Sequence, residues 1–197
     1  MNMPNRLTVL RILLSFVFMF LLFCPGLLCK ILALLVFLLA SVTDFYDGYI
    51  ARKYNLITDL GKILDPIADK ILVLAAFLAF VEMGIVPGWM VVIIIFRELL
   101  ITGIRFSAVN KGKILAAGKA GKHKTVSQMV AIGIILAYLI LKEGSRTITG
   151  QWPAVAECYA QTIINVFMVI TIFLTVWSGL TYVQQNQIIF RHGRDVE

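Results

Sequence analysis

The chain has 197 residues, of which 60% are hydrophobic and 15% charged, and its mean hydropathy is +0.90. Soluble domains carry about 25% charged residues, so the composition excludes an ordinary soluble protein and indicates an integral membrane protein. The length suits a single domain over residues 1–197, without a separate soluble catalytic module. The net charge of +7 does not indicate nucleic-acid binding, because the basic residues stand in short loops between apolar stretches.

Six apolar stretches follow one another along the chain, each near the roughly 20 residues that a membrane-spanning helix needs. Their approximate bounds are residues 7–24, 32–52, 63–81, 90–106, 126–141 and 162–182. Pro25 and Gly26 separate the first two stretches, and Gly84, Pro87 and Gly88 mark a short turn before the fourth. We therefore predict an all-α polytopic membrane protein, a six-transmembrane-helix bundle.

The basic residues are distributed unevenly between the two sides of this predicted bundle. With both termini on one side, 13 of the 18 lysines and arginines fall on that side. Three fall on the other side (Lys30, Lys142 and Arg146), and Lys70 and Arg97 lie within spans. Cytoplasmic loops carry an excess of Lys and Arg. We therefore predict a plasma (cytoplasmic) membrane protein with both termini in the cytoplasm.

Four aspartates stand at the cytoplasmic ends of the second and third predicted spans: Asp44, Asp47, Asp65 and Asp69. Their pattern is D-x-x-D-G-x-x-A-R-x(8)-G-x-x-x-D-x-x-x-D. Carboxylates three or four residues apart share one face of a helix, and carboxylates at membrane depth are usually functional. Four of them would repel one another unless cations bound between them. Oxygen ligands alone favour Mg²⁺, Mn²⁺ or Ca²⁺ over zinc.

The residues beside the aspartates indicate a partner that carries phosphate. Gly48 and Ala51 continue the face of Asp44 and Asp47 with almost no side chain, so a flat group could lie against the backbone. Arg52 follows at the membrane edge, where a phosphate would be met. A magnesium site with few protein ligands is usually completed by phosphate oxygens and water. The pattern therefore suggests transfer chemistry on a diphosphate.

The motif resembles the signature of the CDP-alcohol phosphatidyltransferase family. The residues that carry the resemblance are Asp44-Phe-Tyr-Asp47-Gly48-Tyr-Ile-Ala51-Arg52, Gly61 and Asp65-Pro-Ile-Ala-Asp69. Further segments are similar to the phosphatidylglycerophosphate synthase branch: Pro4-Asn5-Arg-Leu-Thr8-Val-Leu-Arg11, Arg97-Glu98 with Arg105, and Gly118–Met129. Together they cover about residues 4 to 130, and the last third matches only as hydrophobic helices.

The resemblance implies an enzyme that binds CDP-diacylglycerol in a polar cavity open to the cytoplasm, commonly as a homodimer. It implies that Asp44, Asp47, Asp65 and Asp69 bind two divalent cations, Mg²⁺ or Mn²⁺. Asp69 is also the expected general base for the acceptor hydroxyl. The residues implied on the CDP-diacylglycerol side are Asn5, Thr8, Gly48, Ala51, Arg52 and Gly61.

The acceptor implied by this branch is sn-glycerol 3-phosphate, which gives phosphatidylglycerol phosphate and CMP. Its phosphate needs fixed cations, and the candidates are Arg97, Arg105, Lys122 and Lys124. Arg97 lies within a predicted span, where a charge is unfavourable unless it faces a cavity, and Arg105 follows about two turns later. Ordinary positive-inside charge is the alternative for the two lysines. Glu98, next to Arg97, is a candidate for a buried charge pair.

Two alternatives remain open. The same core could use another acceptor, as in cardiolipin or phosphatidylinositol-phosphate synthesis. From a different class, a divalent-cation transporter also carries carboxylates within the membrane. The four aspartates cluster at one membrane edge, whereas transporter sites lie near the midplane, which favours the enzyme.

Overall fold

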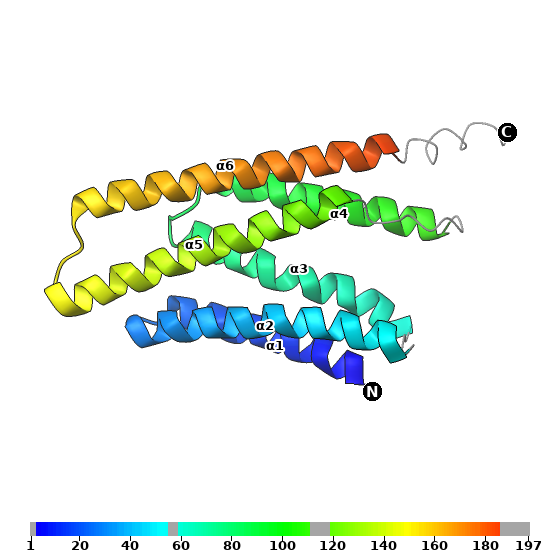
Figure 1. Cartoon of the computed structure of the whole chain (residues 1–197), viewed down its shortest axis with the longest axis horizontal. Coiled ribbons are helices and arrows are strands. Elements are labelled where there is room, and N and C mark those ends of the chain that lie inside the picture. Colours follow the sequence, from blue (N-terminus) through cyan, green and yellow to red (C-terminus); the bar gives the residue numbers. More distant parts are fainter. Residues whose placement is uncertain (1–2, 55–58, 111–118, 186–197) are drawn as a thin grey trace. The chain divides into compact units, whose positions relative to one another are not determined.

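A computed structural model of the chain describes residues 3–54, 59–110 and 119–185, and within them the side chains of 9–43, 70–106, 108 and 123–184. Six helices and no strand occur in this part of the chain (Figure 1). They are α1 (Met3–Phe23), α2 (Leu27–Tyr54), α3 (Asp59–Glu82), α4 (Gly88–Asn110), α5 (Lys119–Thr149) and α6 (Ala154–Gln185). The predicted all-helical fold is confirmed, as are the breaks at Pro25-Gly26 and at Gly84–Pro87.

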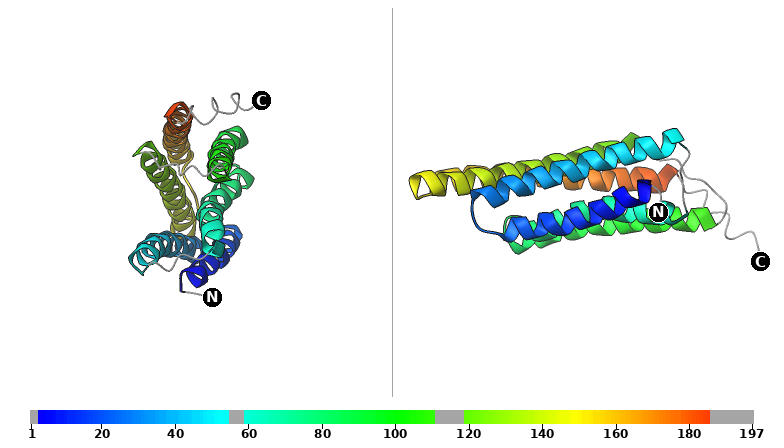
Figure 2. Two further views of the ribbon diagram at one scale, coloured as in Figure 1. Left: turned by 90° about the vertical axis from the view of Figure 1, so that its right-hand side faces the viewer. Right: turned by 90° about the horizontal axis from the view of Figure 1, so that it is seen from below.

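The chain divides into two compact units, which are described separately. The first unit contains Met1–Ile85 and Ile132–Gln161, and the second contains Val86–Ala131 and Thr162–Glu197. In the first unit, α1 packs against both α2 and α3 (Figures 1 and 2). Phe18 of α1 lies 5.7 Å from Phe37 of α2 between ring centroids. Phe77 of α3 is fully buried. Close packing of such aromatic side chains stabilises the unit through van der Waals contacts, which drive the association of helices in a membrane.

Helices α5 and α6 are longer than the apolar stretches that predicted them. The fifth stretch ends near residue 141, but α5 continues to Thr149 and ends before Gly150, whose φ is +72°. Gly150 donates its backbone N–H to the Arg146 carbonyl at 3.1 Å, as expected where a glycine in the left-handed conformation terminates a helix. Charged residues such as Lys142 do not break a helix. The last residue of the apolar stretch therefore does not mark the end of α5.

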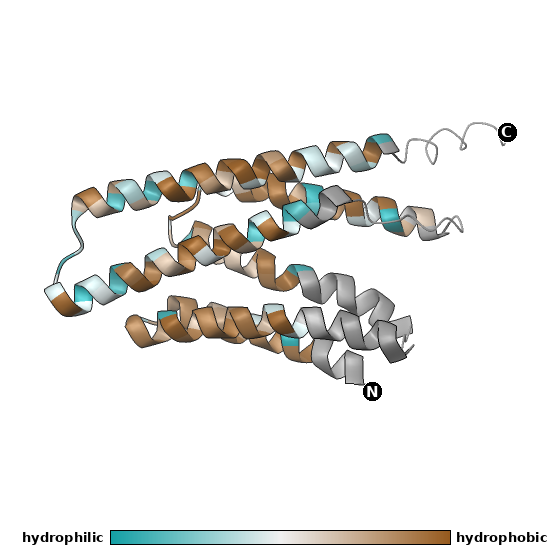
Figure 3. Cartoon of the chain, viewed as in Figure 1, coloured by the Kyte–Doolittle hydropathy of each residue, from teal (hydrophilic) through white to brown (hydrophobic). Residues whose placement is uncertain are grey.

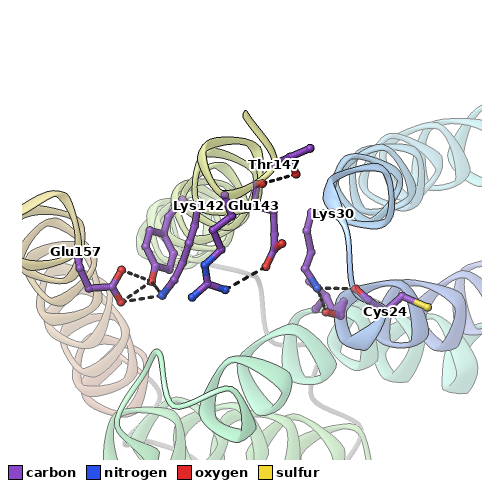
Figure 4. Close-up of polar contacts among 9 residues, drawn as sticks. Cys24, Lys30, Lys142, Glu143, Thr147 and Glu157 are labelled. Atoms are coloured by element: carbon purple, nitrogen blue, oxygen red, sulfur yellow. Dashed lines mark hydrogen bonds and ion pairs between the residues drawn. The ribbon is translucent and has the colours of Figure 1, made fainter. Parts of the chain in front are cut away.

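A lysine satisfies the carboxyl end of α1 (Figure 4). Buried Lys30 of α2 donates from Nζ to the Cys24 carbonyl at 2.8 Å and also to the Leu22 carbonyl. The last carbonyls of a helix have no partner within it, and a cation there also interacts favourably with the helix dipole. Lys30 therefore fixes the tight turn between α1 and α2.

A hydrogen-bonded cluster joins the end of α5 to the start of α6 within the first unit (Figure 4). Lys142 Nζ donates to Glu157 Oε1 at 2.9 Å and to the Tyr138 hydroxyl at 2.7 Å. The Tyr138 hydroxyl in turn donates to the Glu157 carboxylate. The cluster fixes the loop that contains Gly150 and Trp152, because its members come from both sides of that loop.

Most residues along the described helices are hydrophobic (Figure 3). Large hydrophobic side chains are exposed on several helices, including Phe16, Phe20, Phe96, Phe173 and Trp177. Among the described residues, two helices are long and apolar enough to cross a membrane, His123–Thr149 and Ala154–Gln184. Soluble monomers rarely expose so many large apolar side chains, which suggests a membrane protein.

We predict that Lys30→Met lowers thermal stability in detergent by several degrees, because methionine keeps the packing but leaves two carbonyls without their donor. An unsatisfied buried polar group destabilises by about 1–3 kcal/mol. The measurement is the unfolding midpoint of the purified protein. Arg146→Met is the control, since the Arg146 side chain is 53% exposed and its contact with Glu143 is a surface pair. Equal midpoints for the two variants would contradict the capping role.

Candidate active site

The helices place both aspartate pairs near the ends of consecutive helices. Asp44 and Asp47 belong to the carboxyl-terminal part of α2, and Asp65 and Asp69 belong to the first half of α3. Helical backbone at these positions agrees with the predicted sharing of one helix face within each pair. The four side chains lie outside the described residues, so their ligand roles and the general-base role of Asp69 stay predictions. The donor set itself, four carboxylates, suits hard divalent cations.

The residues predicted to contact CDP-diacylglycerol fall on the same three helices. Asn5 and Thr8 belong to α1, Gly48, Ala51 and Arg52 to α2, and Gly61 to α3. Their side-chain surroundings lie outside the described part of the chain, so their contacts are untested. The predicted metal and nucleotide residues are thus all in the first unit.

The predicted acceptor residues are all in the second unit, where a buried polar cluster lies between α4 and α5. Glu98 and Lys124 are buried, and the Lys124 ammonium contacts Glu98 Oε1. Arg97 Nη1 lies 3.5 Å from the same oxygen, so Glu98 has a cation on either side. The candidate pair of Arg97 and Glu98 is therefore confirmed, and Lys124 joins it. These buried charges are tolerated because each has an opposite charge beside it.

The guanidinium of Arg97 also contacts α6. Its Nη2 donates to Ser178 Oγ at 2.7 Å, and the Arg97 side chain is only 12% exposed. Gly179 lies beside it, where an added Cβ would be 3.2 Å from Arg97 Cγ. Arg97 Nε is buried and has no hydrogen-bond partner among the described residues. A guanidinium has five N–H donors in a planar fork, so Arg97 retains capacity to bind an anion.

Arg105 lies near the same helix through a different contact. Its guanidinium carbon is 5.6 Å from the centroid of the Tyr182 ring, within cation–π distance. The Arg105 side chain is exposed on the isolated chain, unlike Arg97. The Lys122 side chain lies outside the described residues, and only its place in α5 is given.

Among the described side chains of this region, cations outnumber carboxylates. Arg97 and Lys124 lie beside Glu98, whereas Arg105 is exposed and contacts only the Tyr182 ring among the contacts described for it. This local excess of positive charge among the described residues is compatible with an anionic ligand.

The last helix, predicted only as a hydrophobic span, has a polar face that was not predicted. Thr171, Thr175 and Ser178 are spaced by four and three residues along α6, and all three are buried. Thr171 Oγ1 donates to the Phe167 carbonyl of its own helix at 2.8 Å and also lies 3.3 Å from the Ser127 carbonyl of α5, and Ser178 accepts from Arg97 of α4. The spacing of small polar residues on one face of an apolar helix was the available signal, since such residues are enriched where membrane helices meet.

A hollow of about 600 Å³ lies at the loop between α5 and α6 in the first unit, and it is a weaker candidate. It is lined by Lys142, Arg146, Gly150, Gln151, Trp152, Ala154 and Glu157. Lys142 pairs with Glu157, and Arg146, whose side chain is 53% exposed, lies 3.6 Å from Glu143. The cations of this hollow are therefore more exposed to solvent than Arg97, whose side chain is 12% exposed.

Comparison with known proteins agrees with these features. The model of the CDP-alcohol phosphatidyltransferase family matches residues 1–177. The chain is 35% identical over 197 residues to the "CDP-diacylglycerol--glycerol-3-phosphate 3-phosphatidyltransferase" of Bacillus subtilis (strain 168), with 94% of this chain and 95% of that protein covered. It is 36% identical over 190 residues to the protein of the same name from Rickettsia typhi, covering 96% and 99% of the two chains.

A third relative comes from another bacterium and carries a different printed name. The "Probable phosphatidylglycerophosphate synthase" of Mycobacterium tuberculosis (strain ATCC 25618 / H37Rv) is 35% identical over 185 residues, with 92% of this chain and 80% of that protein covered. The family model covers most of the chain, and these relatives are similar across almost all of it. The chain therefore belongs to the CDP-alcohol phosphatidyltransferase family.

Proposed function

We propose that the chain transfers the phosphatidyl group of CDP-diacylglycerol to sn-glycerol 3-phosphate, forming phosphatidylglycerol phosphate and CMP. The observation that carries this function is the complete four-aspartate motif on α2 and α3, in a chain whose relatives over nearly its full length are named for this reaction. The buried Arg97 cluster supports the choice of a phosphate-bearing acceptor, because it keeps positive charge and an unpartnered donor.

The aspartates would hold the divalent cations on which the family generally depends. We assign Asp44, Asp47, Asp65 and Asp69 to two ions, either Mg²⁺ or Mn²⁺, since their ligands are all carboxylate oxygens. When bound, such ions neutralise charge that develops on a reacting diphosphate. Gly48 and Ala51 leave space for the nucleotide beside this site, with Asn5, Thr8, Arg52 and Gly61 around it.

Asp69 acts as the general base in this proposal. Its carboxylate accepts the proton of the acceptor hydroxyl as the hydroxyl oxygen forms a bond to the β-phosphorus of CDP-diacylglycerol. The bond between that phosphorus and the oxygen shared with CMP breaks, and CMP leaves with the bonding electron pair. A positioned carboxylate contributes about 10²–10⁴-fold to such a proton transfer.

Arg97 and Arg105 bind the phosphate of the acceptor. A guanidinium binds phosphate oxygens through paired hydrogen bonds, and the packing of Arg97 between α4 and α6 limits its freedom before binding. Lys124 acts through Glu98, since it balances a carboxylate that would otherwise cancel the charge of Arg97. Lys122 adds a flexible positive charge from the start of α5.

The membrane arrangement is also a proposal. The six helices span the bilayer, and the aspartate motif and both termini face the cytoplasm of the plasma membrane, because the excess of Lys and Arg lies on that side. Two further features follow from the family resemblance: a polar cavity open to the cytoplasm and assembly as a homodimer.

We expect Asp44→Asn, Asp47→Asn and Asp65→Asn each to lower CMP release by several orders of magnitude. Each variant removes a negatively charged ligand of the two divalent cations. The assay measures CMP formed from CDP-diacylglycerol and glycerol 3-phosphate. A chelator should abolish wild-type activity, and Mg²⁺ or Mn²⁺ should restore it. Glu143→Gln, outside the motif, is the matched control. Full activity in excess chelator would exclude the metal site.

Asp69→Asn should reduce kcat much more than it weakens CDP-diacylglycerol binding, since a general base acts mainly in the transition state. Turnover is measured at saturating substrate, and binding is measured separately by equilibrium titration with CDP-diacylglycerol. Intact turnover with a pure loss of nucleotide affinity would remove Asp69 from the base role.

Arg97→Ala and Arg105→Ala should raise the KM for glycerol 3-phosphate at least about tenfold, or roughly 1.4 kcal/mol, with a much smaller change in the KM for CDP-diacylglycerol. Arg97→Lys should recover only part of the loss, because an ammonium lacks the planar fork. Lys122→Ala should have a weaker effect, since its side chain is long and flexible. Arg146→Ala is the control, and unchanged KM values for both arginine variants would contradict the acceptor assignment.

A further inference from the structure

Two neighbouring residues of α6 hold the Arg97 side chain from different directions. Ser178 Oγ accepts the hydrogen bond from Nη2 at 2.7 Å, at the end of the side chain. Gly179 faces its middle, where an added Cβ would lie 3.2 Å from Cγ and 3.6 Å from Nε. Both residues follow residue 177, the last residue that the family model matches.

These contacts restrict a side chain that otherwise has many conformations. Fixing a long side chain such as arginine takes up to about 2 kcal/mol of conformational entropy, and a pocket that has already fixed it binds its ligand more tightly. Ser178 engages one Nη2 hydrogen, while Glu98 lies 3.5 Å from Nη1. Buried Nε has no partner among the described residues. The hydroxyl and the carboxylate therefore determine the plane of the guanidinium and leave donors for a phosphate.

Gly179 contributes space rather than a bond. A contact of 3.2 Å is tighter than most real Cβ contacts, so any larger residue at position 179 would displace Arg97 by a few tenths of an ångström. Hydrogen bonds to a bound anion weaken when donors move out of line. A displacement that the fold tolerates would thus still reduce acceptor binding.

We propose that Ser178 and Gly179 are positioning residues of the acceptor site, which orient Arg97 toward the phosphate of the acceptor and so select for acceptors that carry a phosphate. This inference rests on the proposed function, because it assigns an orienting role to α6 in that same reaction. Neither residue touches the acceptor, and both act through Arg97.

The first test is a double-mutant cycle on Ser178 and Arg97, with CMP release measured over a range of glycerol 3-phosphate concentrations. Ser178→Ala should raise the KM for glycerol 3-phosphate about threefold to tenfold, with kcat and the KM for CDP-diacylglycerol within about twofold of wild type. In the Arg97→Ala background the same change should have almost no further effect, since residues that act as a unit are not additive. Thr181→Ala, on the same helix, is the control and should match wild type.

The second test compares two glycine variants that gain the same helix propensity. Gly179→Ala should raise the KM for glycerol 3-phosphate at least about threefold, whereas Gly133→Ala, whose added Cβ would meet nothing within 4 Å, should leave it unchanged. This comparison decides the question if Ser178→Ala does not accumulate. A purely structural role would instead lower the unfolding midpoint or kcat while the KM for the acceptor stayed the same.

The possible outcomes distinguish a failure of the positioning role from a failure of the proposed function. Suppose that the wild type uses glycerol 3-phosphate and that the Ser178 and Gly179 variants have the wild-type KM for it. The positioning role is then wrong, and the proposed function stands. The same conclusion follows if the effect of Ser178→Ala on this KM is fully additive with that of Arg97→Ala. If wild type transfers to no phosphate-bearing acceptor, both are wrong. A rise in KM that disappears in the Arg97→Ala background confirms the role.

Discussion

Charged groups inside an apolar helix bundle must be neutralised where they stand, and the rest of this structure depends on that constraint. In the second unit, Glu98 lies between Arg97 and Lys124, and Ser178 accepts a hydrogen bond from Arg97. These contacts connect α4 to α5 and to α6. In the first unit, Lys30 neutralises the carboxyl end of α1 in the same way. Because unpaired charges at this depth are strongly unfavourable, the polar contacts determine how these apolar helices meet.

The same constraint bears on the proposed reaction. If the aspartates of α2 and α3 come together as proposed, divalent cations would offset the repulsion between their carboxylates, and an acceptor phosphate would pair with the cations around Arg97. The ions and substrates of the proposed phosphatidyl transfer would thus supply the opposite charges. An enzyme site that is complete only when its ligands are bound favours charged substrates over neutral analogues, because a neutral molecule leaves the buried groups unpaired.

The fold could be predicted from the sequence to the extent that local signals determine it. Pro25 and Gly26 break the first apolar pattern, and Gly84 and Pro87 break the third, so the number and order of helices follow from the sequence. The ends of α5 and α6 do not, because hydropathy alone does not show that α5 continues past Lys142 to the left-handed Gly150.

The candidate site could be predicted only in part. Arg97 and the aspartates stand out because charge is rare in such a chain. The contact between Arg97 and Ser178 joins residues 81 apart in sequence, and no local pattern specifies such a contact. Lys124 was predicted as an acceptor ligand, but its contact with Glu98 depends on how α4 and α5 pack. The polar face formed by Thr171, Thr175 and Ser178 on α6 was not predicted, and their regular spacing alone does not indicate which side chain that face meets.

Phosphatidyl transfer to a phosphate-bearing alcohol is the reaction proposed for this membrane domain. The most direct measurement is an acceptor screen with purified protein, labelled CDP-diacylglycerol and Mg²⁺ or Mn²⁺, followed by identification of the lipid product. We expect CMP release and phosphatidylglycerol phosphate with sn-glycerol 3-phosphate, and very little product with glycerol. Preferred transfer to inositol phosphate or phosphatidylglycerol would contradict the acceptor, and movement of divalent cations across vesicles without any CMP release would contradict the enzyme itself.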